Sequence, residues 1–285
     1  MINTANTVLL SITQTLRKDS FELIGDFGLS MLEVIIQIVA GCIIAFGIYK
    51  CFKKRVSIKE TAFLKELIII LFSTLIGMIL PLGVYGIIPI AAVLLFLGFR
   101  LYTILPMIFS NVLFTILIPF NDPTFVWRTG YRRVILAFAA GLLIGVVCKA
   151  FKSDPGKFLR EGNMPDFTIM PAGIKGILNL FTQIINKAGL YVIFGIIIDT
   201  LFHKYLFWKV IDFIFTNPNT SFIPKYFAGL NVVNPFFLLT MAIARMLMGF
   251  ITMSALLAFF KPRGWVLYYG YYLILAVLLG ISAFF

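Results

Sequence analysis

The segment from Leu67 to Phe99 reads LIIILFSTLIGMILPLGVYGIIPIAAVLLFLGF and contains no charged residue. It is longer than the roughly 20 residues that one membrane helix needs, and too short for two complete crossings with a loop. Its middle, Pro81–Pro89, holds two prolines and two glycines, and proline interrupts a helix because it lacks an amide hydrogen and clashes with the preceding turn. The pattern predicts a broken-helix hairpin over 67–99: two half-helices, joined by an irregular segment 81–89, that re-enter from the cytoplasmic side.

The composition points to the same environment. Of 285 residues, 61% are apolar and 13% are charged, against about 45–50% and about 25% in soluble domains. This excludes a disordered chain and argues against an ordinary soluble enzyme. The three cysteines make no disulfide framework. We expect an all-α polytopic membrane protein with about six to eight membrane segments, located in the cytoplasmic (inner) cell membrane with the lipid bilayer as its partner.

The charges next to the apolar runs set the expected topology. Residues 1–26 are predicted to form an interfacial amphipathic helix, and the first span covers 27–49. Six cations follow between Lys50 and Lys65, and five more lie in 149–175, which places both segments in the cytoplasm by the positive-inside tendency. The net charge of +12 therefore comes mostly from cations that orient the protein in the membrane, and we expect no nucleic-acid partner.

The cytoplasmic linker 149–175 divides the chain into two membrane halves, 27–148 and 176–285. Because the spans 27–49 and 189–207 are predicted to run in opposite directions, an inverted repeat and unrelated halves both stay open. Segment 235–260 is either a plain span or a second broken hairpin. In the span 134–148, Ala137, Gly141 and Gly145 favour close packing inside the protein over a homodimer, which also stays open.

Motifs for catalysis are missing from the sequence. His203 is the only histidine, no cysteine pair has zinc-finger spacing, and there is neither a phosphate-binding loop nor a serine nucleophile elbow. We therefore expect no enzyme, no catalytic residue, no cofactor and no metal.

Polar side chains inside apolar spans are the candidate functional residues, because such groups are costly in hydrocarbon. Arg245 is the strongest of them, since an arginine at mid-membrane costs about 2.5–3.5 kcal/mol and needs a partner. That partner is either Glu33, as a structural pair or a gate, or an anionic group of a substrate. Glu33 and Gln37 lie four residues apart on one helical face, and we assign both to gating or charge pairing.

The broken segment provides the rest of the predicted site. Irregular backbone at membrane depth must be buried in protein or line a cavity, and a half-helix beginning after Pro89 would favour negative charge. Pro81 and Pro89 are the predicted hinges. The predicted substrate-binding residues are Gly83, Tyr85, Gly86, Pro89, Ser110, Asn111 and Arg245.

The same stretch resembles a known family. The run Leu80–Ala91, LPLGVYGIIPIA, followed by Leu94-Leu95, Gly98 and Ser110-Asn111, is similar to the signature of the predicted permeases of the ArsP/YraQ type. The resemblance implies a polytopic permease with two related halves, and some members of the family expel trivalent organoarsenicals. The cysteines of the family's turn are replaced here by Gly83, Val84 and Tyr85. Because thiolates bind such soft ligands, we expect a different substrate.

The expected function is secondary transport of a small, anionic solute by alternating access, in the direction of efflux. One alternative is a flippase for a phosphate-bearing lipid, which would need a lateral opening between spans. Another is a non-transporting membrane subunit, for which a dry, fully packed centre around 81–89 would be the sign.

Overall fold

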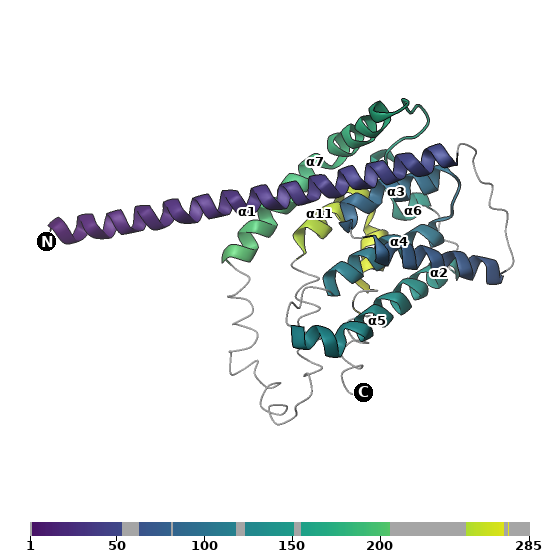
Figure 1. Cartoon of the computed structure of the whole chain (residues 1–285), viewed down its shortest axis with the longest axis horizontal. Helices are drawn as coiled ribbons and strands as arrows, with labels where there is room; N and C mark the ends of the chain where they lie inside the picture. The colour runs from purple at the N-terminus through teal and green to yellow at the C-terminus, as the bar shows by residue number, and fades with distance from the viewer. Residues whose placement is uncertain are drawn as a thin grey trace, which may run out of the picture.

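The computed structural model describes residues 2–52, 63–80, 82–117, 123–150, 155–205, 249–270 and 273. Regular structure in these ranges is helical, and their only β pairing is one antiparallel bridge between Leu159 and Phe260. This confirms the all-α class (Figure 1). The elements are α1 (Ile2–Cys51), α2 (Phe63–Ile79), α3 (Gly83–Phe96), α4 (Leu101–Leu117), α5 (Pro123–Ala150), α6 (Pro155–Phe158), η1 (Glu161–Asn163), α7 (Ile174–Tyr205) and α11 (Phe250–Phe259).

Two helices among the described residues are long and apolar enough to cross a membrane, Glu22–Cys51 within α1 and Ile174–Phe202 within α7. Shorter apolar helices of 10–17 residues are Gly83–Phe96, Leu101–Asn111, Phe138–Ala150 and Phe250–Phe259. The structure therefore supports two candidate spans, and the larger number of six to eight stays a prediction.

Both long helices run past their predicted boundaries. Residues 2–51 form one helix, so the interfacial segment 1–26 is continuous with the first span instead of separate from it, and Figure 1 shows its N-terminal part reaching away from the other helices. Helix α7 likewise joins the amphipathic stretch after Ile174 to the following span. Neither sequence contains a proline within the helix that would end it.

Helices α1 and α7 pack side by side in opposite directions. Gly176, near the start of α7, lies against the ring of Phe46 near the end of α1. At the other end, Lys204 Nζ lies 3.5 Å from the carboxylate of Glu22. This agrees with the opposite directions expected for the spans 27–49 and 189–207.

The hairpin 67–99 contains the two expected half-helices, but its break is shorter than predicted. Gly83, with φ +55°, already begins α3, and Pro89 lies inside that helix. The expected irregular segment 81–89 is therefore wrong beyond its first residues. Proline at the seventh residue of α3 removes only one backbone hydrogen bond, and the helix continues because the surrounding protein buries it from Val84 to Val93.

The two half-helices run in opposite directions and pack on different neighbours. Helix α3 follows the direction of α1, since Gly83 lies against Gln37 and the rings of Phe96 and Tyr49 are 6.0 Å apart. Helix α2 instead lies along α4 and α5. A turn at 97–100, with Gly98 at φ +96°, connects α3 to α4.

The glycine stripe of α5 is used inside the protein, as expected. A Cβ on Gly141 would overlap the side chain of Thr74, and a Cβ on Gly145 would overlap that of Ile70. Both neighbours belong to α2, so the two glycines let α5 approach α2 closely.

Helix α11 bears on the expected repeat. Phe250 and Phe202 have ring centroids 5.1 Å apart, and Ser254 lies against Gly195, so α11 runs opposite to α7 and in the same direction as α3. Counterparts in an inverted repeat run in opposite directions. Helix α11 is therefore not the inverted counterpart of α3. The rest of the segment 235–260, up to residue 248, lies outside the described residues.

Candidate functional site

Ser110 and Asn111 hold the end of α2 at the break. The hydroxyl of Ser110 donates a hydrogen bond to the carbonyl of Thr74 at 3.0 Å. The amide nitrogen of Asn111 donates to the carbonyl of Gly77 at 3.0 Å and to that of Leu80. Because the last carbonyls of a helix have no partner within it, the contacts of Asn111 stabilise the buried end of α2. Ser110 and Asn111, two of the residues predicted to bind a substrate, are thus hydrogen-bonded to α2.

The N-terminus of α3 lies against the first candidate span. The side chain of Gln37 occupies the space that a Cβ of Gly83 would need. Gln37 Nε2 also donates to Glu33 Oε1 at 3.1 Å, which confirms that these two polar residues share a face of α1. Glu33 is exposed and Gln37 is half-buried. The structure thus brings three predicted residues, Gly83, Gln37 and Glu33, to one place.

Gly86 serves a close helix crossing. A Cβ on Gly86 would overlap the carbonyl of Gln37, and one on Gly41 would overlap the carbonyl of Gly86. The backbones of α1 and α3 therefore touch, as they do where small residues meet in membrane helices. Pro89, predicted both as hinge and as ligand contact, is buried within the regular part of α3.

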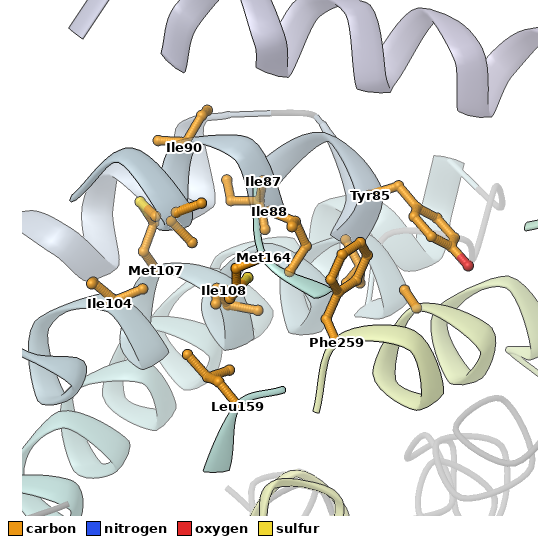
Figure 2. Close-up of a cluster of buried hydrophobic side chains, with 14 of the residues drawn as sticks. Tyr85, Ile87, Ile88, Ile90, Ile104, Met107, Ile108, Leu159, Met164 and Phe259 are labelled. Atoms are coloured by element: carbon orange, nitrogen blue, oxygen red, sulfur yellow. The ribbon is translucent and has the colours of Figure 1, made fainter. Parts of the chain in front are cut away.

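Tyr85 makes the polar contact between α3 and α11. Its hydroxyl and that of Ser254 are 2.7 Å apart, and its ring meets the edge of Phe259 at a centroid distance of 6.3 Å. Ser254 Oγ also donates to the carbonyl of Ile251 at 2.8 Å. Figure 2 shows Tyr85 at the edge of the buried apolar cluster, beside Phe259. Ser254 was not assigned to the predicted site, although its hydroxyl in an apolar run was a usable signal.

A second buried polar group lies at the other end of α2, where no site was predicted. Lys149 Nζ is 2.5 Å from Glu66 Oε2, and only 6% of the Glu66 side chain is exposed. Glu66 precedes the apolar run that begins at Leu67. The hydrogen bond from Lys149 holds the pKa of Glu66 below its usual range, against the opposing effect of burial. The pair joins α2 to α5.

Several predicted features lie outside the described residues. These are Arg245, the strongest single candidate, Pro81, and the side chain of His203. Whether Arg245 pairs with Glu33 is therefore still a prediction. In the described part of the chain no three His, Cys, Asp or Glu side chains gather as a metal site.

The described residues therefore define a helical protein with two candidate membrane spans, whose central helix α3 is buried between α1, α4 and α11. Compared with known proteins, the chain matches no family model, no curated protein and no solved structure.

Proposed function

We propose that this protein is a multi-pass permease of the cytoplasmic membrane that moves a small solute by alternating access. The observation that carries the proposal is the reversal between α2 and α3, where Gly83 lies next to Gln37 and begins a helix buried from Val84 to Val93. Broken helices inside a membrane protein are tolerated where they are enclosed by protein, and transporters use them to bind substrates. The likeness of 80–111 to the permease signature points the same way.

In this proposal Gln37, Tyr85 and Ser254 face the transported solute, because Gln37 lies against Gly83 and Ser254 against Tyr85, both in the first turn of α3. Ser110 and Asn111 keep the break in place instead of binding the solute. Arg245 supplies the positive charge that makes an anion the proposed substrate.

The burial of α3 favours a second candidate, a membrane subunit that transports nothing. Ten consecutive residues, from Val84 to Val93, are buried, and Tyr85 is satisfied by Ser254. A centre packed in this way serves a scaffold as well as it serves the closed state of a permease.

Thiol labelling separates the two. In a Cys51→Ser chain reconstituted in vesicles, Ser254→Cys is treated with a membrane-impermeant methanethiosulfonate. The matched control is Thr74→Cys, because Thr74 is also a buried hydroxyl that donates to its own helix, at 2.8 Å to Ile70. A permease predicts that Ser254→Cys reacts from one side of the membrane while Thr74→Cys does not.

If neither cysteine reacts, the permease proposal fails and the scaffold remains. If both react equally, the helices open in general and no defined pathway exists. The substrate's charge is tested separately, by thermal-shift screening against inorganic anions, phosphate-bearing lipids and organoarsenicals. Stabilisation that survives Arg245→Ala would remove Arg245 from the proposed site.

A further inference from the structure

The described helices form two groups, which do not coincide with the two halves of the sequence. The first group is α2, α4 and α5. Gly77 of α2 lies against the backbone of Met107 in α4, and Gly141 and Gly145 of α5 lie against α2. The ion pair of Glu66 with Lys149 adds a buried charged contact to these close crossings.

The second group is α1, α3, α7 and α11. Its crossings are equally close, with Gly41 of α1 against the backbone of Gly86 in α3, and Gly195 of α7 against Ser254 in α11. The hydrogen bond between Tyr85 and Ser254 adds a polar contact from α3 to α11. Backbone-level packing and buried polar contacts of this kind resist separation.

The contact between the groups has a different character. It includes the packing of α3 on α4, where Ile87 and Ile88 of α3 and Ile104 and Ile108 of α4 belong to the buried cluster in Figure 2. The ring of Phe109 in α4 also contacts Phe260, the residue directly after α11, at a centroid distance of 6.1 Å, and Tyr268, which lies beyond α11, at 5.5 Å. These contacts are apolar and are not fixed by hydrogen bonds. Packed helices with such contacts can slide past one another by small amounts.

The chain passes between α3 and the first group at two short connections. One leads from the end of α2 to Gly83, which has φ +55°, and the other is 97–100, which contains Gly98 with φ +96°. Glycine adopts such angles at no steric cost. Short connections of this kind are where hinges form, because a few residues can absorb the change in backbone angles.

From these observations we propose that the two groups are the moving parts of the protein, and that they rock against each other about Gly83 and Gly98, at the two ends of α3. The idea rests on the proposed function, because alternating access needs two bodies that move. It assigns α1 and α3 to the same body as α7 and α11, so that the moving unit cuts across both halves of the sequence.

The test is a set of spin-label distances in nanodiscs, in the Cys51→Ser background. The labels replace exposed residues: Leu32 on α1, Ile76 on α2, Leu143 on α5 and Leu190 on α7. The pair 32/143 spans the groups, whereas 32/190 and 76/143 each lie within one group. Each distance is measured in the background chain and in Phe109→Ala, which removes the aromatic contact between the groups.

We expect the 32/143 distribution to shift or widen by several ångströms in Phe109→Ala, while the other two pairs stay unchanged. The matched control is Phe167→Ala, which removes a buried ring that contacts Tyr49 and Phe96 within the second group and leaves 32/143 as it was. If Phe109→Ala does not fold, Phe109→Leu gives the same comparison with a smaller cavity.

Movement within a group as large as that between groups would overturn the proposal. Three distances that stay unchanged in every variant would also overturn the proposal, because the helices would then be one rigid body. The outcome is independent of the labelling of Ser254→Cys. If the 32/143 distance changes while Ser254→Cys stays unreactive, the two-body proposal is supported and the permease proposal is rejected. If Ser254→Cys reacts while the 32/143 distance is unchanged, only the two-body proposal is rejected.

Discussion

Single glycines decide how closely the helices approach. Gly41 and Gly47 lie on the same helix, yet a Cβ at 41 would overlap the carbonyl of Gly86 while one at 47 meets nothing within 4 Å. Glycine in a helix costs about 1 kcal/mol relative to alanine. At position 41 that cost is offset because the residue lets α1 and α3 touch.

Gly41→Ala is therefore expected to destabilise the protein by about 1–3 kcal/mol, because it overpacks a backbone contact that cannot give way. Gly47→Ala should be neutral or stabilise by up to about 1 kcal/mol. Thermal unfolding of both variants in the same detergent measures the difference. Equal melting temperatures would show that the α1–α3 crossing is not tightly packed.

Glu66 and Glu22 make a second matched comparison. Glu66→Gln should cost about 1–3 kcal/mol because it weakens a buried, charge-assisted hydrogen bond. Glu22→Gln should cost less than about 1 kcal/mol, because the Glu22 side chain is 56% exposed and surface pairs contribute little.

The pH dependence has a definite sign. Because Lys149 holds the pKa of Glu66 below its usual range, the unfolded chain binds this proton more readily than the folded one. The contribution of Glu66 is therefore present above the unfolded pKa of about 4.3 and is lost as the pH falls through the folded value. Melting curves between neutral pH and pH 3 should fall more steeply for the wild type than for Glu66→Gln, and parallel curves would contradict the assignment.

At the scale of elements, the end of α2 shows how a buried break is stabilised. The carbonyls of Gly77 and Leu80 accept hydrogen bonds from Asn111, since the chain after them cannot continue the helix through Pro81. A side chain on α4 thus completes the last turn of α2. A buried carbonyl left unpaired there would otherwise cost about 1–3 kcal/mol.

Asn111→Leu keeps the size of the side chain and removes its donor, and we expect it to destabilise the protein by about 1–3 kcal/mol. The control is Asn179→Leu on α7, because the amide of Asn179 makes a long contact of 3.8 Å to the sulfur of Met170 and sulfur is a weak acceptor. Hydrogen exchange of the amides at the end of α2 should quicken in Asn111→Leu alone. Unchanged exchange would show that the break is held by other contacts.

At the scale of the molecule, the end of α1 lies against the linker between α6 and α7. Tyr49 of α1, Phe96 of α3 and Phe167 of the linker make ring contacts of 5.8–6.0 Å. The linker also pairs with the end of α11, where the amide of Lys261 donates to the carbonyl of Phe158 at 2.8 Å. We propose that this end faces the cytoplasm, because its described residues include Lys50, Lys157 and Arg160.

Native Cys51 tests this orientation, because it is exposed at that end while Cys42 and Cys148 are buried. An impermeant maleimide should label Cys51 in inside-out vesicles and leave intact cells unlabelled. In the Cys51→Ser background, Glu22→Cys at the other end of the span should give the opposite pattern. Labelling of Cys51 from outside would reverse the topology.

Much of the local architecture followed from the sequence. The apolar runs predicted helices, Pro81 and Gly83 predicted the reversal, and the stripe of Gly141 and Gly145 predicted close packing. The pattern was less informative at Pro89, which looked like part of the break but lies within α3. A single proline does not end a helix whose surroundings bury it on several sides, and those surroundings cannot be read from neighbouring residues.

Local composition was thus enough to predict the helical class and the start of the break, because each depends on residues close together in the chain. Which helices pack together needed the three-dimensional structure. Only the folded structure shows that α3 packs apart from α2. It also pairs residues that are far apart in the chain, such as Glu66 with Lys149, and Tyr85 with Ser254, which are 169 positions apart. Such partners are selected by the fit of complete helix surfaces, which only the folded chain brings into contact.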